Sequence, residues 1–329
     1  MTPTVPDHRP VMLAGEMLVD AFSEATVPGG APFNVARSLA ALGLETLMVS
    51  RLGRHNGTPD VDAALLLQAA AAHGMSATGI QWDDLHPTGR VRVSEAAGGH
   101  HFEIASDAAW DHLAAGPALT LLEDRQPGWL VMGTLAQRSP ASRHALQALA
   151  AAARSQGCEV YLDLNLREGC ERATAEASLA LAGWLKINDA EWLQLGDWFE
   201  LPHADPLGAP ETLRPTVAAL QSRFGIGPVV LTRGKAGYAC FGPGATLIAA
   251  APAHPLDLLR DTVGAGDAFS AMLLAALVRG RPLHAALALA NRYAAAICGE
   301  RGAVPARASF FTPWREALDH GASMTGAAT

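Results

Sequence analysis

Short runs of apolar residues alternate along the chain with longer segments in which apolar residues recur every three or four positions. Residues 11–22 (VMLAGEMLVDAF) and 45–53 (ETLMVSRLG) have the length and aliphatic content of buried strands, and residues 34–43 have a helical spacing that ends at Gly43. The same pattern predicts strands over residues 129–133, 158–166, 183–188 and 228–234 and helices over residues 61–74 and 141–157. This alternation predicts an α/β fold with a mostly parallel, doubly wound sheet between two layers of helices.

Residues 90–104 (RVRVSEAAGGHHFEI) depart from this pattern because polar and apolar residues alternate around Gly98 and Gly99. The alternation and the glycine pair predict an antiparallel hairpin, and hence a small sheet apart from the main one that could cover a ligand. A surface hairpin without that role is the alternative. His100 and His101 indicate contacts with solvent or with a lid rather than a metal site, because adjacent strand residues point to opposite faces.

The composition excludes several classes of protein. Of the 329 residues, 50% are hydrophobic and 17% are charged, which excludes a disordered or fibrous chain. The net charge of -8, with no dense run of lysine and arginine, argues against a surface for nucleic acid or for an anionic membrane. The cysteines share no metal-binding spacing and indicate reduced thiols: Cys158, Cys170, Cys240 and Cys298.

No feature of the sequence predicts export or membrane insertion. Residues 1–10 are polar and proline-rich and lack the apolar core of a signal peptide. The longest apolar run, residues 269–278, has about half of the roughly 20 residues that a membrane-spanning helix needs. We therefore expect a soluble, cytoplasmic protein.

The most informative segment is residues 260–280, where Gly264, Ala265 and Gly266 lead directly into a helix with Asp267 in its first turn. Free N–H groups at the start of a helix, together with the helix dipole, bind anions, and small residues let a phosphate approach the backbone. A carboxylate beside a bound phosphate can take the proton from a hydroxyl that attacks it. The alternative is an acidic residue that only stabilises the first turn of an ordinary helix.

Two other segments place polar residues where strands are expected to end. In residues 159–167 (EVYLDLNLR), strand alternation puts Tyr161, Asp163, Asn165 and Arg167 on one side, facing the crevice where α/β sheets bind ligands. A polar strand end without a ligand is the alternative.

Asn188 and Glu191 follow the expected strand at residues 183–188 with the spacing of a helix capping box. The sequence contains no G-x-x-x-x-G-K-[ST] segment and no G-x-G-x-x-G after the first expected strand. It is therefore neither a P-loop protein nor a typical dehydrogenase.

These segments together resemble the PfkB family of carbohydrate kinases, which has a ribokinase-like fold. Residues 261–267 (DTVGAGD) match the family's C-terminal signature, residues 28–43 (PGGAPFNVARSLAALG) resemble its N-terminal signature, and residues 15–20 (GEMLVD) resemble its first strand, which ends in a sugar-binding aspartate. The resemblance implies a three-layer αβα sandwich with a small β-sheet lid. It covers residues 11–315 in the family's order.

The domain organisation follows from the same resemblance. The kinase domain is expected over residues 11–315, with lid segments at about residues 15–30 and 88–105, and flexible tails at residues 1–10 and 321–329. The resemblance also implies ATP and Mg²⁺ as cofactors, K⁺ as a candidate further ion, and a homodimer formed through the lid.

The resemblance assigns site residues by their positions in the matched segments. It implies catalytic roles for Asp267, Gly264, Ala265 and Gly266, with Asp267 as general base and the helix start as anion hole. It implies sugar binding by Asp20, Gly30, Asn34, Asp163 and Arg167. It implies ATP binding by Asn188, Thr232, Gly234, Gly237, Gly264, Gly266 and Asn291. It implies Mg²⁺ at Asn188 and Glu191 through water, and a monovalent cation at Asp261, Val263 and Gly302.

The substrate is less well defined than the reaction. PGGAPFN and DLNLR are most similar to fructokinases, which favours phosphorylation of fructose to fructose 6-phosphate. Ribose, 2-keto-3-deoxygluconate, a nucleoside, or a non-catalytic sugar- or nucleotide-binding regulator are the alternatives.

Three positions depart from the family pattern. Leu164 replaces the usual proline, and Arg233 stands where leucine or lysine is common. Residues 54–63 (RHNGTPDVDA) replace the usual G-x-D-x-x-G, and Asp60 or Asp62 is the candidate replacement for its acid. That loop borders the expected sugar site.

Overall fold

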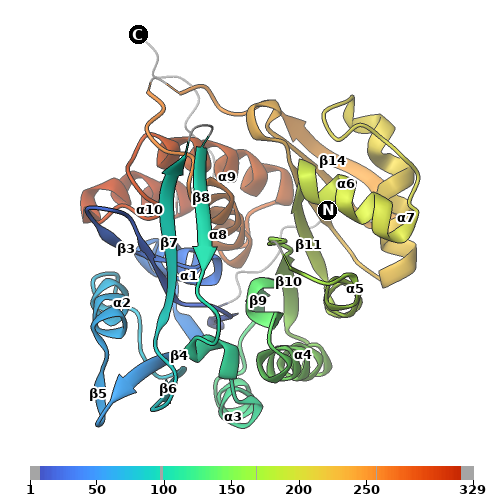
Figure 1. The fold of residues 1–329 in the computed structure, drawn as a ribbon. Coiled ribbons are helices and arrows are strands. Elements are labelled where there is room, and N and C mark those ends of the chain that lie inside the picture. Colours follow the sequence, from blue (N-terminus) through green and yellow to red (C-terminus); the bar gives the residue numbers. More distant parts are fainter. Residues whose placement is uncertain (1–7, 97–98, 168, 257, 320–329) are drawn as a thin grey trace.

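The structure is a computed structural model that describes residues 8–96, 99–167, 169–256 and 258–319 (Figure 1). Most of both expected tails, residues 1–7 and 321–329, lies outside the described residues, as does Gly98 of the expected hairpin turn.

One large sheet forms the centre of the described chain. Its strands are β1 Val11–Ala14, β4 Thr46–His55, β5 Thr58–Pro59, β6 Ile80–Asp83, β9 Trp129–Met132, β10 Glu159–Asp163, β11 Trp184–Asn188, β12 Val229–Thr232, β13 Tyr238–Gly242 and β14 Thr246–Ala251. Their order is β14-β13-β12-β11-β10-β9-β1-β4-β5, with β6 also paired to β4. All pairs from β12 to β4 are parallel, and β5, β13 and β14 pair antiparallel. The mostly parallel sheet is confirmed.

Helices cover both faces of this sheet (Figure 1). One face packs against α3 Ala115–Arg125, α4 Pro140–Ser155, α5 Arg172–Leu181, α6 Asp189–Phe199 and α7 Arg214–Phe224, and the other against α1 Ala31–Ala41, α2 Val61–Ala71, α8 Ala265–Val278, α9 Leu283–Cys298 and α10 Thr312–Asp319. In β1, Met12 and Ala14 enter the first core while Val11 and Leu13 enter the second. Strands buried on both faces explain the continuous apolar runs, and the three-layer sandwich is confirmed.

Short 3₁₀ turns connect several of these elements: η1 Ala109–His112, η2 Leu135–Gln137, η3 Pro210–Leu213, η4 Gly234–Ala236, η5 Pro243–Ala245 and η6 Ala308–Phe310. Among the described residues, no helix combines the length and the apolar character that crossing a bilayer requires.

A second, four-stranded sheet lies apart from the large one. Its strands are β2 Leu18–Ala21, β3 Thr26–Gly29, β7 Gly89–Ala96 and β8 Gly99–Ile104, in the order β3-β2-β7-β8. The antiparallel pair β7–β8, which Figure 1 shows side by side, confirms the predicted hairpin. We call these four strands the small sheet.

Two of the predicted strands are wrong in extent. Residues 11–22 form β1 and β2 in different sheets, because the chain turns at Gly15, whose φ of 149° and close approach to Pro32 exclude a side chain. β10 ends at Asp163, and Asn165 adopts a left-handed φ of 45°. Asp163, Asn165 and Arg167 therefore do not form one face of a strand.

Candidate active site

The start of α8 has the geometry of an anion site. Gly264 caps the helix with a left-handed φ of 78°, and a Cβ there would overlap Ala303. The first helical bond runs from the Ala268 N–H to the Gly264 carbonyl (2.8 Å), while the Ala265 N–H donates to the carbonyl of Thr262 (3.3 Å). Of the N–H groups expected to form the anion hole, those of Gly266 and Asp267 therefore remain available, because they precede the first helical bond.

Asp267 is held by a side chain from the opposite end of the sequence. Asn34 Nδ2 donates to Asp267 Oδ2 at 2.8 Å, and Arg37 Nη2 donates to Asn34 Oδ1 at 2.7 Å. Burial raises the pKa of Asp267 to about 6; the charge of Asp163 raises it further, and the bond from Asn34 lowers it. The carboxyl group is thus ionised near neutral pH but basic enough to accept a proton. Asn34, whose expected contact with the sugar stays a prediction, also holds the Asp267 carboxylate through this bond.

A buried ion pair lies beneath this helix start. Lys186 Nζ in β11 donates to Asp163 Oδ2 in β10 at 2.7 Å, and Ser270 Oγ donates to the same oxygen at 2.9 Å. Burial alone would lower the pKa of Lys186, but the charge of Asp163 and its hydrogen bond outweigh burial and raise it. A Cβ at Gly266 would lie 3.3 Å from Lys186 Nζ, so the ammonium group adds positive charge directly below the anion site.

Sequence reasoning missed Lys186 and assigned Asp163 to the sugar. The available signal was a single lysine inside the apolar run GWLKIN, because a lysine in a buried strand needs a charged partner. The identity of that partner is not visible in the sequence.

Glu16, also missed, brings a buried carboxyl group to the β1–β2 turn. Its side chain is 2% exposed; Oε1 accepts the N–H of Ala31 at 3.2 Å, and Oε2 has no hydrogen-bond partner among the described residues. Burial raises the pKa of Glu16 to about 7, opposed by the charge of Arg167 and reinforced by that of Asp267. The N-cap of α1, Gly30, must lack a side chain, because a Cβ there would lie 2.5 Å from the Glu16 carbonyl oxygen.

Asp20 lies in β2 near the same group of charges. Burial raises its pKa to about 6, while Arg167 and Arg37 lower it and Asp267 raises it. Since the charges of Arg167 and Asp267 act on both Glu16 and Asp20, the four groups share one neighbourhood. Arg167 is exposed, on the loop that follows β10.

Four of the residues expected at the nucleotide lie around the ends of β12 and β14: Thr232, Gly234, Gly237 and Asn291. Thr232 ends β12 and its hydroxyl donates to the carbonyl of Ile187 (3.3 Å), while Gly234 lies in η4. Gly237 packs against the end of β14, where a Cβ would overlap the carbonyl of Ala251. Asn291 of α9 donates to the carbonyl of Pro252 (2.9 Å), so three separate elements meet there.

The capping box at Asn188 and Glu191 is confirmed. Asn188 Oδ1 accepts the Glu191 N–H and Glu191 Oε2 accepts the Asn188 N–H, both at 2.9 Å, and Glu191 Oε1 accepts the N–H of Leu166 at 2.8 Å. Glu191 therefore joins the loop after β10 to α6. Each of its oxygens accepts one backbone N–H and keeps a further lone pair, which could accept a hydrogen bond from the water of a hydrated cation.

The candidate monovalent-cation residues also lie together. Asp261 Oδ1 accepts the N–H of Val263 at 2.9 Å, and Asp261 Oδ2 accepts the N–H of Gly302 at 3.1 Å. The carboxylate thus joins the loop before α8 to the loop after α9.

The atypical loop at residues 54–63 supports the small sheet. Asp60 caps α2 through the N–H of Ala63 (2.7 Å) and also accepts the N–H of Thr88 (2.8 Å). Asp62 pairs with Arg90 in β7 at 2.6 Å. Both carboxylates therefore bond to residues around the start of β7, Asp60 to Thr88 and Asp62 to Arg90.

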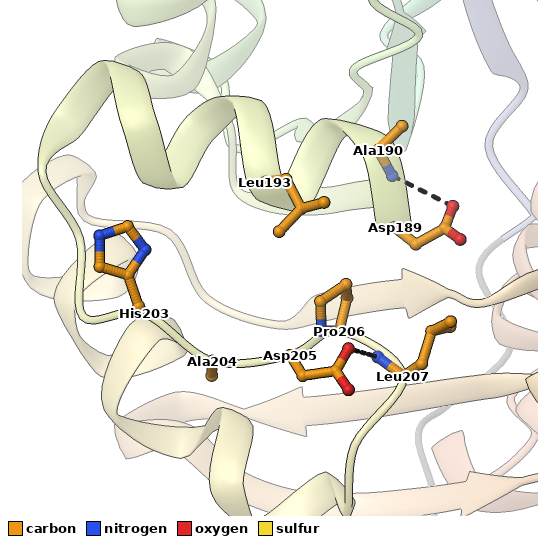
Figure 2. A pocket seen from close by; sticks show the side chains of 8 residues that line it. All are labelled: Asp189, Ala190, Leu193, His203, Ala204, Asp205, Pro206 and Leu207. Atoms are coloured by element: carbon orange, nitrogen blue, oxygen red, sulfur yellow. Dashed lines mark hydrogen bonds between the residues drawn. The ribbon is translucent and has the colours of Figure 1, made fainter.

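Two cavities lie near residues expected at the nucleotide, and Asp267 lines neither of them. A cavity of about 620 Å³ lies between the start of α6 and residues 203–207 (Figure 2). Another, of about 400 Å³, lies between the loop at residues 254–260 and α9, next in sequence to Asp261 and Asn291.

Comparison with known proteins gives one consistent answer. Residues 6–308 match the pfkB family carbohydrate kinases. The chain is 27% identical over 320 residues to the fructokinase of Salmonella typhimurium, covering 90% of this chain and 95% of that protein. It is also 27% identical over 328 residues to the bifunctional protein HldE of Methylobacillus flagellatus, covering 91% of this chain but only 62% of the length of HldE.

Solved structures show the same fold. The ribokinase of Arabidopsis thaliana, complexed with ribose and ATP, superimposes with a TM-score of 0.77 at 21% identity and covers 94% of this chain and 99% of its own. The ribokinase-like fold is therefore confirmed. Because the family match spans nearly the whole chain and includes the segments that carry Asn34 and Asp267, this protein belongs to the pfkB family of carbohydrate kinases and is an ATP-dependent sugar kinase.

Proposed function

We propose that this kinase phosphorylates a hydroxyl of a small sugar, with fructose as the first candidate and fructose 6-phosphate as the product. The observation that carries the proposal is the position of Asp267, in the first turn of α8 and close enough to buried Glu16 and half-buried Asp20 for its charge to act on both. Fructose is favoured by the segments PGGAPFN and DLNLR and by the similarity to a fructokinase over 90% of the chain.

Each group has a defined part in the reaction. Asp20 and the backbone at Gly30 bind sugar hydroxyls, and Asn34 keeps Asp267 oriented. Asp267 takes the proton of the attacking sugar hydroxyl. At the same time the hydroxyl oxygen forms a bond to the terminal phosphorus of ATP, and the bond between that phosphorus and ADP breaks. The N–H groups of Gly266 and Asp267, with Lys186 below them, stabilise the charge on the transferred phosphoryl group.

The nucleotide and cations occupy the other side of α8. Thr232, Gly234, Gly237, Asn188 and Asn291 border the ATP. Bound Mg²⁺ would neutralise phosphate charge, and the bonding at Asn188 and Glu191 suits holding it through water.

The proposed site of a monovalent cation such as K⁺ is formed by Asp261, Val263 and Gly302. In the same proposal, Arg167 lies near the sugar and Asp163 lies near the phosphoryl group. The support is that Asp261 joins the two loops that carry the other residues.

The small sheet serves as a lid in this proposal and as the surface of a homodimer. β3 and β8 are its edge strands, and exposed edges pair readily with another copy. Closure over the sugar would exclude water and limit hydrolysis of ATP. Slower hydrogen exchange in β7 on addition of sugar, absent with ATP alone, would support closure, and unchanged exchange would contradict it.

A coupled assay of ADP release over a panel of sugars tests the substrate. We expect the highest kcat/KM for fructose, compared with ribose, 2-keto-3-deoxygluconate and nucleosides. The Asp267→Asn protein, purified identically, measures the contribution of contaminating kinases. A higher kcat/KM on another sugar would replace fructose, and ATP binding without turnover on any acceptor would favour the non-catalytic regulator.

A further inference from the structure

Two histidines and an aspartate meet at the base of the small sheet. His112 Nε2 lies 2.8 Å and His86 Nε2 lies 3.7 Å from the same oxygen, Asp107 Oδ1. The two imidazole rings lie face to face with centroids 3.6 Å apart and an interplanar angle of 13°. One donor atom from each of the three side chains falls within 4.8 Å of the other two. None of these residues belongs to the site around Asp267.

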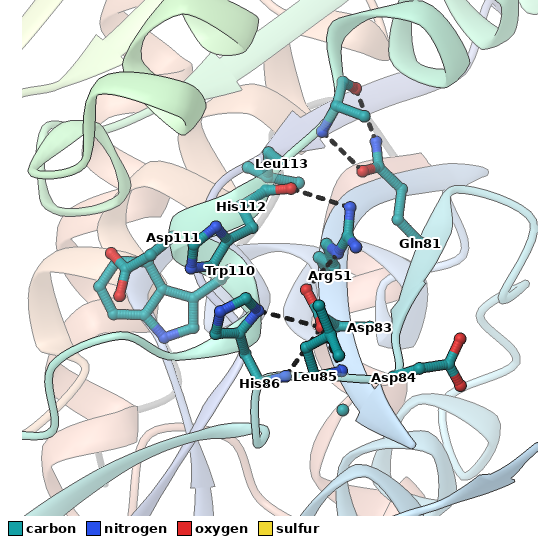
Figure 3. Close-up of polar contacts among 12 residues, drawn as sticks. Arg51, Gln81, Asp83, Asp84, Leu85, His86, Trp110, Asp111, His112 and Leu113 are labelled. Atoms are coloured by element: carbon teal, nitrogen blue, oxygen red, sulfur yellow. Dashed lines mark hydrogen bonds and ion pairs between the residues drawn. The ribbon is translucent and has the colours of Figure 1, made fainter. Parts of the chain in front are cut away.

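The position of His86 is fixed from the protein interior. His86 Nδ1 bonds to Asp83 Oδ1 at 3.1 Å, and the same oxygen accepts the N–H groups of Leu85 and His86 at 2.8 Å (Figure 3). Asp83 is 1% exposed and pairs with Arg51 at 2.8 Å. Since an ionised carboxylate only accepts, Nδ1 carries the proton and the lone pair of His86 is on Nε2, toward Asp107. This imidazole–carboxylate pairing is the usual support of a metal-binding histidine.

His112 is fixed by the same arginine. It ends η1, and its carbonyl accepts Arg51 Nη1 at 3.0 Å (Figure 3). Arg51, in β4, therefore supports both histidines through one side chain. The next residue, Leu113, donates its N–H to Ser142 in α4 (2.8 Å), which anchors η1 to the core.

We propose that His86, Asp107 and His112 form a zinc site that joins the two ends of the β7–β8 hairpin. Two imidazole nitrogens and one carboxylate oxygen are a donor set that suits Zn²⁺, whereas Mg²⁺ prefers oxygen ligands only. Tetrahedral ligands at about 2.1 Å from zinc lie roughly 3.4 Å apart, and the two Nε2 atoms lie 2.8 Å and 3.7 Å from Asp107 Oδ1. The stacked rings must tilt apart to point both Nε2 atoms at one ion, which takes the place of the proton between His112 and Asp107 and leaves a fourth position for water.

The place of the site in the chain gives it a consequence. His86 lies in the segment that enters β7, and Asp107 and His112 lie in the segment that leaves β8. Without an ion, the cluster links the two segments through the stacked rings of His86 and His112 and through the 3.7 Å approach of His86 Nε2 to Asp107, whose side chain is 71% exposed. Zinc would make that link rigid and restrict the β7–β8 hairpin at its base, without contacting substrate.

Isothermal titration with ZnCl₂ alone, on the full chain in excess MgCl₂, tests the proposal. We expect one ion per chain. His86→Asn keeps a donor toward Asp83 but lacks Nε2, and should lower zinc affinity at least about 100-fold, the upper end of what losing a supporting partner costs. Thermal melts in EDTA check that the variant folds. In wild type, zinc should also slow hydrogen exchange over residues 84–88 and 105–108, and in His86→Asn it should not.

Two matched controls separate this site from adventitious binding. His203→Asn, at an exposed loop position, and the pair His100→Asn/His101→Asn in β8 should both bind zinc as wild type does. The proposal is overturned if wild type binds no stoichiometric zinc, if folded His86→Asn binds it equally well, or if the His100/His101 pair removes it. None of these outcomes depends on which sugar the kinase uses.

Discussion

Beneath α8, Lys186 and Asp163 form a buried ion pair. Near the β1–β2 turn, by contrast, the carboxyl groups of Glu16 and Asp20 form no ion pair with any described residue. The pair on the phosphate side keeps Lys186 charged, since the pKa of that lysine is raised. On the sugar side, burial raises the pKa of Glu16 to about 7 and that of Asp20 to about 6. The two sides of Asp267 therefore handle burial of charge differently.

In the proposed reaction, the difference follows from what each side binds. A phosphate brings fixed negative charge, so a site can be prepared in advance with a cation held by its own counterion. A sugar brings neutral hydroxyl donors, so its site needs acceptors that are unsatisfied until the sugar arrives. Such acceptors cost stability in the free protein and gain hydrogen bonds on binding.

Removing the proposed base should have the largest effect. Asp267→Asn preserves the shape of the side chain but cannot accept the proton, so kcat should fall by roughly two to four orders of magnitude while ATP and sugar still bind. Steady-state kinetics and equilibrium binding measure the two quantities. Near wild-type kcat would leave Asp267 as a helix-stabilising residue only.

The pH profile sharpens this first prediction. Because Asp267 must be ionised to act, kcat/KM should fall as pH drops below about 6, the raised pKa of its carboxyl group. The assay runs from pH 5 to 8 with stability checked at each point. A rate that is constant across pH 6 would argue against this carboxylate as the base.

Breaking the ion pair on the phosphate side should cost stability. Lys186→Met leaves Asp163 buried and unpaired, which typically destabilises a protein by about 3–5 kcal/mol. The control Asp163→Asn/Lys186→Met removes both charges and should recover much of that loss in denaturant unfolding at pH 7. Equal free energies of unfolding for the single and double variants would mean that the pair is not coupled by charge.

On the sugar side, neutralising Glu16 should stabilise the protein. Its pKa is raised from 4.5 to about 7, so protonation favours the folded state; that stabilisation is complete below about pH 4.5 and is lost as pH rises through 7. At pH 8 the free energy of unfolding of Glu16→Gln should therefore be roughly 3 kcal/mol larger than that of wild type. This difference should decrease as the pH is lowered toward 5. Glu24→Gln, at an exposed position, is the control. A gap independent of pH would contradict the prediction.

The smallest expected effect is that of a single sugar contact. Losing a buried hydrogen-bond partner costs about 1–3 kcal/mol, so Asp20→Ala should raise the sugar KM roughly 5- to 150-fold and leave the Kd for ATP nearly unchanged. Thermal melts accompany the kinetics. A much lower Tm with normal sugar kinetics in the folded protein would assign Asp20 a structural role.

Local patterns in the sequence were enough for the layers of the fold and for two features of the site. Apolar alternation predicted the parallel sheet and the hairpin, because side-chain periodicity is a property of each strand and helix by itself. The glycine-led start of α8 and the capping box at Asn188 and Glu191 are likewise set by residues within a few positions of one another. Expectations failed where a bend interrupts an apolar run, at Gly15 and Asn165.

Only the tertiary structure decided which polar side chains meet. Asn34 and Asp267 are 233 positions apart, and their contact exists because α1 and α8 pack on the same face of the sheet. Lys186 contacts Asp163 because β10 and β11 are neighbours, and His86 approaches His112 because the two ends of the β7–β8 hairpin return to the same place. A sequence shows that a buried charge needs a partner, but the partner is fixed by the packing of distant elements, which short-range periodicity does not encode.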